Sequence, residues 1–339
     1  MQQITGDEAT YYYRVNNKTE GVIELHVDDF LVMGSNIFFE TVVKSLKGRF
    51  KFGKIEKNEF RFCGIDIKVT PEGSYVSQNE YVNAIKEIEV DSYDDLERPL
   101  TKEEFKAYRG VTGKLIWLNE ITRPDISFDS LSLSFHNKDA KVKDIVAANK
   151  VIRKAKAIDS YIKFGRVGNF NDLKILTHAD ASHLTVEEKS KGVAGKIIFM
   201  SNKDETIVSP VHWKSKTIAQ ACTSAKAAET RAAYMACDDS IGLARALMEL
   251  YTGKKGEKQV ETTIKIDSQS LLDTLFSTKQ IEEKILRPTV LAMKQMLTRN
   301  NIGRFDWVES SDNLADIFTK KGSKGSENLI NILQTGQNP

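Results

Sequence analysis

Residues 172–180 read DLKILTHAD and residues 260–267 read VETTIKID. Each run is rich in aliphatic and β-branched residues, which is typical of a strand that is buried in a sheet. Each run also ends in an aspartate. The two aspartates are Asp180 and Asp267. The second half of the chain therefore predicts two strands that each deliver an acid at one end.

Two helices carry the other acids of interest. Residues 223–250 form a long Ala-rich stretch that predicts a helix, and Glu229 lies in its closely packing part. A short helix is expected over residues 312–320, with Asp316 inside it. These acids are far apart in the sequence, so only the fold can unite them. A structural role is the alternative for each, because strand-end aspartates often cap the next element and a helical Glu is usually exposed.

The other elements of the second half mix strands and helices. Apolar alternation and turn residues predict a hairpin, and helical spacing returns further along, interrupted near Pro288 where a new first turn tolerates proline. The expected elements are strands at 192–202 and 209–216, helices at 270–276 and 281–300, and a strand at 305–308.

The first half begins with a predicted hairpin. Residues 21–36 read GVIELHVDDFLVMGSN, two β-rich runs with Asp28 and Asp29 at the tip between them. A strand pair or bulged strand is expected around Gly64. Helical spacing follows over residues 101–121, which open with the capping box Thr101-x-x-Glu104, and again over residues 139–158.

The best boundary in the chain is the Gly- and Asn-rich segment GRVGNFNDLK at residues 165–174. A length of 339 residues predicts about two domains, and 40% hydrophobic residues fit a globular chain. We therefore expect an α+β or α/β protein with domains at 1–165 and 172–322 and a tail at 323–339.

Several classes of protein are excluded by composition. No uncharged apolar run approaches the roughly 18 residues of a membrane helix, and residues 1–10 show no signal-peptide pattern, so we expect a soluble intracellular protein without membrane contact. Three widely spaced cysteines and five dispersed histidines argue against a disulfide framework and a zinc site.

A net charge of +2 says nothing about nucleic acid, but basic residues gather between Lys141 and Arg166. This stretch holds eight basic and two acidic residues, 8 − 2 = +6, and such a stripe can contact phosphates. A solvated helix face is the alternative. The residues that we single out as candidates for nucleic-acid binding are Lys150, Arg153, Lys154 and Lys156.

The second half resembles the ribonuclease H domain of copia-type retrotransposons. Six short blocks match it in the right order, and they stand out together although each is weak alone. These blocks are Asp180-Ala-Ser, Lys189-Ser-Lys-Gly-Val-Ala-Gly, His212-Trp-Lys-Ser-Lys, Ala228-Glu229, Asp267-Ser-Gln-Ser and Ala315-Asp316-Ile-Phe-Thr-Lys320.

The first half resembles the reverse transcriptase that precedes this domain in the same polyprotein. His26-Val-Asp-Asp29 is similar to the Tyr-x-Asp-Asp hairpin of reverse transcriptase palms, with His in place of Tyr. Further matches lie at residues 50–67, at 108–113 and in Thr122-Arg-Pro-Asp-Ile126. The resemblance implies a partial palm and thumb or connection region, followed by a ribonuclease H-like mixed sheet with flanking helices.

This resemblance implies metal-dependent hydrolysis of the RNA strand of an RNA–DNA hybrid. Two Mg²⁺ or Mn²⁺ ions are expected, with Asp180 bridging both, Glu229 and Asp267 holding one, and Asp316 holding the other. The upstream reverse transcriptase and integrase portion would be a partner. The expected location is a cytoplasmic virus-like particle, with the nucleus as the second compartment.

The sequence departs from the family at three points. Asp28 and Asp29 resemble the metal ligands of a polymerase site whose third carboxylate is missing, so we predict no DNA synthesis by this chain alone. Lys284-Ile-Leu286 lacks the histidine of the usual Lys-His-Ile, and Glu229 is followed by Thr-Arg instead of Tyr. Trp213 and Trp307 could stack on bases or serve as core residues.

Two other functions remain open at this point. The chain could be a non-catalytic remnant that binds nucleic acid or a partner, with its acids surviving as structure. It could also be an assembly module that needs the rest of the polyprotein to fold, since palm strands cut from their sheet leave an exposed edge.

Overall fold

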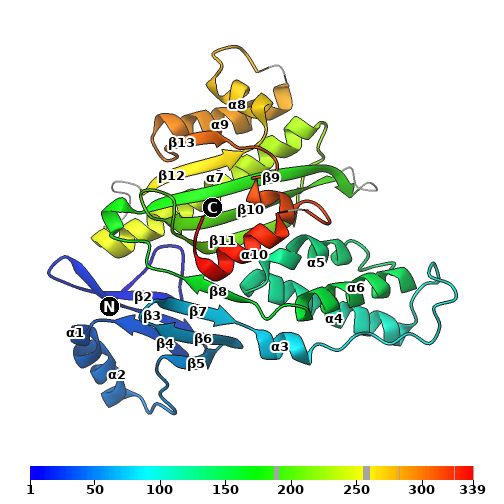
Figure 1. Ribbon diagram of the computed structural model, residues 1–339. Coiled ribbons are helices and arrows are strands. Elements are labelled where there is room, and N and C mark those ends of the chain that lie inside the picture. The colour runs from blue at the N-terminus through cyan, green and yellow to red at the C-terminus, as the bar shows by residue number, and fades with distance from the viewer. Residues whose placement is uncertain (187–190, 255–259, 282, 324, 339) are drawn as a thin grey trace.

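The computed structural model describes residues 1–186, 191–254, 260–281, 283–323 and 325–338. Within these ranges the strands form three sheets, two of four strands and one of five (Figure 1). The two smaller sheets and a group of helices come from the first half of the chain, and the five-stranded sheet comes from the second half. This arrangement confirms the predicted α+β class.

The first sheet is an antiparallel meander in the order β1-β2-β3-β4. Phe38 is fully buried against it, where a Cβ atom at Gly21 or Gly34 would lie within 2.4 Å of its ring. Only glycine leaves room for this ring. The elements are β1 (Gln2–Gln3), β2 (Thr10–Val15), β3 (Lys18–His26), β4 (Asp29–Gly34), α1 (Asn36–Phe38), η1 (Phe39–Val43) and α2 (Lys44–Arg49).

The second sheet combines three consecutive strands with a fourth strand that lies more than 80 residues further along the sequence. Strand β8 pairs antiparallel with β7, and the helices between residues 79 and 156 lie between these two strands in the sequence. This pairing closes the helical group onto the sheet. The strands are β5 (Glu59–Phe62), β6 (Ile65–Thr70), β7 (Gly73–Ser77) and β8 (Tyr161–Phe164).

The helical group has its own apolar core, built on α4 and α6. The Thr101–Glu104 capping box at the start of α4 is confirmed. Past the end of α4, the buried guanidinium of Arg123 donates to Asp125 at 2.8 Å and also to the carbonyl of Ala155 on α6. The elements are α3 (Asn79–Ala84), α4 (Lys102–Ile121), η2 (Pro124–Ile126), α5 (Ser127–Ser134) and α6 (Val142–Lys156).

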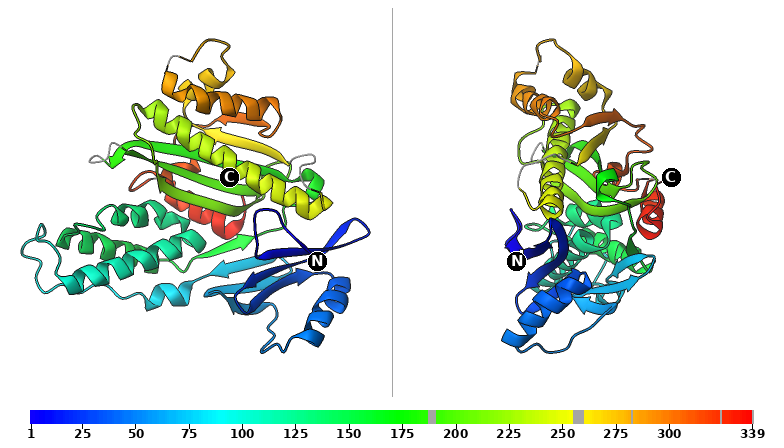
Figure 2. Two further views of the ribbon diagram at one scale, coloured as in Figure 1. Left: turned by 180° about the vertical axis from the view of Figure 1, so that it is seen from behind. Right: turned by 90° about the vertical axis from the view of Figure 1, so that its left-hand side faces the viewer.

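The third sheet has the order β11-β10-β9-β12-β13. Strands β11, β10 and β9 are antiparallel, whereas β9, β12 and β13 run parallel. Helix α7 covers one face, and η6 with α10 covers the other (Figure 2). This is the predicted ribonuclease H-like mixed sheet. Its strands are β9 (Lys174–Val186), β10 (Lys191–Ser201), β11 (Val208–Thr217), β12 (Glu261–Ile266) and β13 (Arg304–Trp307).

The helices around this sheet differ from the sequence prediction in two places. The helix expected over 281–300 starts later, with a 3-10 turn at Lys284–Leu286. The predicted interruption near Pro288 is confirmed, because a new helix begins at Arg287 with Pro288 in its first turn. The predicted tail at 323–339 instead contains a helix whose apolar residues are buried against the sheet. The elements are η3 (Phe170–Asp172), α7 (Ala225–Thr252), α8 (Gln269–Phe276), η5 (Lys284–Leu286), α9 (Arg287–Thr298), η6 (Leu314–Phe318) and α10 (Ser326–Thr335).

The two halves of the chain contact each other through helix α7 and through strand β11. Arg14 of β2 donates to the carbonyls of Leu250 and Tyr251 at 2.9 and 2.6 Å, which satisfies acceptors at the C-terminal end of α7. The indole N–H of Trp213 on β11 donates to the carbonyl of Asn119 on α4 at 2.7 Å. No helix in the described ranges has the length and apolar character needed to cross a bilayer.

Candidate active site

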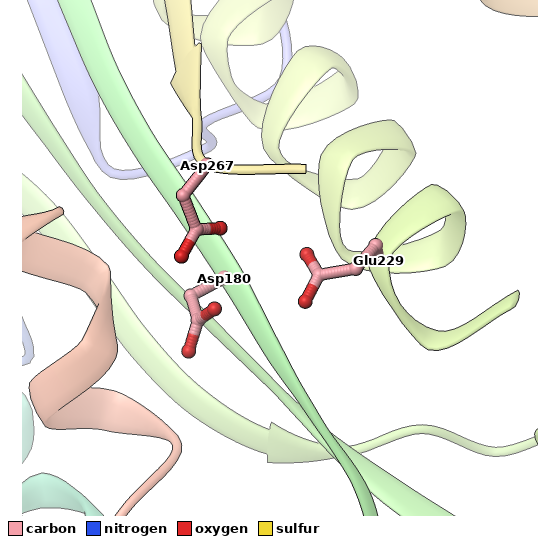
Figure 3. Close-up of side chains that lie close together, drawn as sticks. All are labelled: Asp180, Glu229 and Asp267. Atoms are coloured by element: carbon pink, nitrogen blue, oxygen red, sulfur yellow. The ribbon is translucent and has the colours of Figure 1, made fainter. Parts of the chain in front are cut away.

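Three carboxylates meet where β9 and β12 part. The residue pairing of these parallel strands ends at His178 and Lys265, and Asp180 and Asp267 each follow two residues later. Glu229 reaches the same place from the second turn of α7. The three side chains point toward one another (Figure 3), and each offers one oxygen within 4.8 Å of the others. We call Asp180, Glu229 and Asp267 the acidic triad.

Hydroxyl donors hold two members of the acidic triad. Thr319, just after η6, donates to Oδ2 of Asp180. Ser310 donates to Oδ2 of Asp267 at 2.6 Å, and Trp307 donates its indole N–H to the Asp267 backbone carbonyl at 3.2 Å. Each bond engages one carboxylate oxygen or the backbone beside it, so the acids are oriented before any cation binds.

Burial makes the acidic triad electrostatically unfavourable when its members are charged. Burial raises the pKa of Glu229 to about 9, and the negative charges of Asp180 and Asp267 act in the same direction. Burial also raises the pKa of Asp180 to about 6, against the opposing effects of the Thr319 hydroxyl and the Lys320 ammonium. A cation among these oxygens would relieve both penalties.

The donor set fits a hard divalent cation. Oxygens bound to one Mg²⁺ at about 2.1 Å lie no more than roughly 4.2 Å apart, so small side-chain movements would bring the acidic triad around one ion. Three carboxylates with no sulfur or imidazole ligand favour Mg²⁺ or Mn²⁺ over zinc.

The fourth predicted acid, Asp316, lies near the acidic triad but outside it. Its Oδ1 atom accepts a bond from Lys320, one turn further along, and its Oδ2 accepts from Ser323 at 2.9 Å. The Lys320 ammonium is also 3.8 Å from Oδ2 of Asp180. The structure therefore places a lysine between the fourth acid and the other three.

A second pair of residues, which the sequence did not reveal, anchors the segment that carries Asp316. Leu314 donates its backbone N–H to Nδ1 of His178 at 3.3 Å, and Asn313 donates to the carbonyl of Ala179 at 3.0 Å. Burial lowers the pKa of His178 to about 3, and the nearby Lys265 acts in the same direction, so the imidazole is neutral. These bonds tie η6 to the strand of Asp180.

The predicted hairpin with two acids at its tip is present, but these acids do not belong to the acidic triad. Asp28 and Asp29 are exposed, beside Val27 with a φ of 55°. Within the part of the chain that the structure describes, neither belongs to a group of three or more close metal-ligating side chains. The polymerase-type pair therefore has no third ligand there.

The basic helix α6 is partly neutralised within the molecule. Arg153 forms an ion pair with Glu87 at 2.5 Å, and Lys154 forms one with Asp129 at 2.9 Å. Lys150 and Lys156 are exposed, and neither has an ion-pair partner among the residues described. Two of the four candidate phosphate contacts are therefore free.

The two tryptophans have different environments. Trp213 is buried in the core of the large sheet, as the structural interpretation of this residue predicts. Trp307 is half exposed beside Asp267. The block that begins at Lys189 lies in part outside the described residues, and its described part, Lys191–Gly195, belongs to β10.

Comparison with known proteins identifies relatives among transposon proteins. No family model matches the chain. It is 23% identical over 229 residues to a putative transposon Ty5-1 protein of Saccharomyces cerevisiae, covering 62% of this chain and 70% of that protein. It is 23% identical over 221 residues to the retrovirus-related Pol polyprotein from transposon RE1 of Arabidopsis thaliana, covering 61% of this chain but only 14% of that polyprotein.

Solved structures that are similar to the chain include reverse transcriptase and ribonuclease H proteins. A foamy viral protease-reverse transcriptase, solved in complex with RNA/DNA hybrid, covers 85% of this chain at 12% identity and a TM-score of 0.48, over 36% of its own length. The N-terminal ribonuclease H domain of a Mycobacterium tuberculosis protein covers 46% at 17% identity and a TM-score of 0.31, over 98% of its own length.

Proposed function

We propose that this chain, whose homologues are Ty/copia-type retrotransposon Pol polyproteins, hydrolyses the RNA strand of RNA–DNA hybrids. The observation that carries the proposal is the acidic triad. Asp180 lies in β9 and Asp267 directly follows β12, the neighbouring strand of the same mixed sheet, while Glu229 lies in helix α7. Their oxygens lie within 4.8 Å of one another. Three carboxylates so close together repel one another when ionised, and a divalent cation bound between them would remove this repulsion.

The chemistry follows from the acidic triad and its surroundings. A bound Mg²⁺ or Mn²⁺ ion supplies Lewis acidity and a water of lowered pKa for attack on a phosphodiester. Asp180, Glu229 and Asp267 would hold such an ion. Thr319 and Ser310 would keep two of these carboxylates in place, while Asp316 marks the side from which a second cation would bind. The 2′-hydroxyl of RNA is the group that would distinguish the cleaved strand from DNA.

The test is cleavage of a labelled RNA–DNA hybrid by the purified chain with Mg²⁺, with Mn²⁺ and with a chelator. We expect metal-dependent cleavage that Asp267→Asn reduces by at least 100-fold, because that change removes a ligand charge. Asp273→Asn is the matched control, since Asp273 is an exposed aspartate of the neighbouring helix α8. Metal-independent cleavage, or equal effects of both variants, would contradict the proposal.

We also propose that this chain alone does not synthesise DNA. The support is the position of Asp28 and Asp29, which are exposed at a hairpin tip without a third ligand in the described residues. Primer extension on an RNA template should yield no product in conditions that support hybrid cleavage. Template-dependent nucleotide incorporation by the purified chain would refute this.

A non-catalytic role in binding is the second candidate. The observation that favours it is the ion pair between Lys320 and Asp316, which engages the fourth acid. In that case a folded chain would bind hybrid in the presence of a chelator and would not cleave it when metal is added. Filter binding beside the cleavage assay separates the two functions.

A further inference from the structure

Lys320 is held against two of the four acids of the candidate site. Its ammonium contacts Oδ1 of Asp316 and lies 3.8 Å from Oδ2 of Asp180. The same Asp180 oxygen accepts the Thr319 hydroxyl, so consecutive residues approach one carboxylate together. The Lys320 side chain is about half exposed, at 48%, which leaves it free to move without unfolding the segment.

Asp316 has both oxygens engaged by neighbours in its own segment. Oδ1 is paired with Lys320 and Oδ2 accepts from Ser323 at 2.9 Å. A divalent cation shared by Asp180 and Asp316 would need an oxygen from each. The Lys320 ammonium already lies between these two carboxylates. An ammonium and a divalent cation cannot occupy the same space, and their charges repel each other.

Lys320 and one divalent cation together balance the charges of this arrangement to within one unit. With four ionised carboxylates, Lys320 and one divalent ion, the site has a net charge of −4 + 1 + 2 = −1, counted over Asp180, Glu229, Asp267, Asp316 and Lys320. A second divalent ion with Lys320 still in place would bring it to +1. A compact, strongly hydrated ammonium is a suitable monovalent occupant of such a position.

We propose that the Lys320 ammonium occupies the second cation position of the site in the hybrid-free protein. One divalent ion then binds at the acidic triad, and Lys320 excludes a second one between Asp180 and Asp316. This inference rests on the proposed function, because it assumes that the acidic triad binds a divalent ion. It assigns Lys320 as a positioning residue that sets the number of ions.

The test is the number of Mn²⁺ ions bound without hybrid, measured by calorimetry and by the EPR signal of free Mn²⁺. We expect one ion per chain for the wild type and two for Lys320→Met. Lys321→Met is the matched control, because Lys321 is an exposed neighbour, and it should still bind one ion. Thermal melts of all variants without metal confirm that each chain is folded.

The outcomes separate this inference from the proposed function. Two ions on the wild type, or one ion on Lys320→Met, would overturn the role of Lys320 while hybrid cleavage could still stand. No ion on the wild type or on either variant would contradict both. Lys320→Arg, which keeps the charge, should bind one ion, and a second ion on this variant would also overturn the inference.

Discussion

Gly195 of β10 lies against Phe318 of η6 so closely that a Cβ atom at residue 195 would be 2.7 Å from the Cβ of Phe318. The same atom would be 2.7 Å from Cγ2 of Thr319. Gly195 is also directly opposite Asp180 in the register of β9 and β10. The missing side chain therefore lets the segment with Thr319 and Lys320 lie directly over Asp180.

We expect Gly195→Ala to push this segment away from the site. The added methyl group meets the Cβ of Phe318, the backbone carbonyl of Ala315 and Cγ2 of Thr319. The first two atoms are fixed by the backbone, so a rotamer change of Thr319 alone cannot absorb it. Overpacking of this kind costs about 1–3 kcal/mol in the free energy of unfolding. Hybrid cleavage should fall further than stability explains, because the bond from Thr319 to Asp180 is lost.

The control for this change is Gly242→Ala in α7. A Cβ atom at Gly242 meets nothing within 4 Å, and alanine is favoured over glycine in a helix by about 0.5–1 kcal/mol. Chemical denaturation should show Gly242→Ala to be neutral or stabilised, with cleavage unchanged. Equal destabilisation of both variants would show that the close approach of Gly195 to Phe318 is not the cause.

The buried ion pair of Arg123 and Asp125 should be essential for folding of the helical group. Both side chains are almost fully buried, and Arg123 also donates to the carbonyl of Ala155 on α6. Asp125→Asn leaves the Arg123 charge buried without its counter-charge, which we expect to cost about 3–5 kcal/mol in the free energy of unfolding.

Urea denaturation checks this prediction, with Glu87→Gln as the control. Glu87 pairs with Arg153 of α6, and both side chains are substantially exposed. Exposed pairs contribute little to stability, so Glu87→Gln should shift the midpoint only slightly. A midpoint for Asp125→Asn close to that of the control would contradict a structural role for the buried pair.

The sequence predicted the parts of the site that depend on local pattern. Asp267 follows β12 directly, as predicted, but the strand expected to end at Asp180 continues to Val186. Asp180 meets Asp267 because the parallel pairing of β9 with β12 ends two residues before each acid. Glu229 could be singled out because alanines surround it on a long helix. Local pattern therefore placed each acid on its element, whereas their union in one site was expected only from the resemblance to ribonuclease H.

The contacts between distant segments could not be predicted in this way. His178 bonds to Leu314 across 136 positions, and no local pattern distinguishes it from an ordinary strand histidine. Lys320 is a different case, because its spacing of four from Asp316 is a visible signal of a helical ion pair. What could not be seen was that the turn would place the same ammonium beside Asp180. The helix α10 was missed because its apolar residues are buried only by packing against β8 and β11, which lie far away in the sequence.

Salt dependence should reveal which lysines of α6 contact nucleic acid. Lys150 and Lys156 are exposed, whereas Arg153 and Lys154 are paired with Glu87 and Asp129. If Lys150 and Lys156 each contact one phosphate, the double change to Ala should reduce the slope of log affinity against log salt by roughly 1.5–2. Arg153→Ala should change this slope less.

Fluorescence anisotropy with labelled hybrid at several salt concentrations measures the slope for the wild type and for each variant. Identical slopes for the double variant and the wild type would favour a solvated helix face.

Without metal, the stability of the protein should fall as the pH rises toward 9. The folded-state pKa of Glu229 is raised to about 9 by burial and by its acidic neighbours, above its ordinary value of 4.5. Between these values the folded chain binds more protons than the unfolded chain, so the free energy of unfolding decreases with increasing pH. We expect a loss on the order of 2 kcal/mol between pH 7 and pH 9 in a chelator. Urea denaturation across this range measures it.

Two comparisons test the assignment of this alkaline loss to Glu229. Glu229→Gln removes the titrating carboxyl, so its stability should stay nearly level between pH 7 and pH 9. Excess Mg²⁺ should have a similar effect on the wild type, because a cation bound to the ionised acids stabilises the folded state. The loss on the acid side should persist in Glu229→Gln, since buried His178, with a pKa lowered to about 3 by burial, must gain a proton on unfolding as the pH falls through about 6.5. An alkaline loss that survives in Glu229→Gln would place its origin in another group.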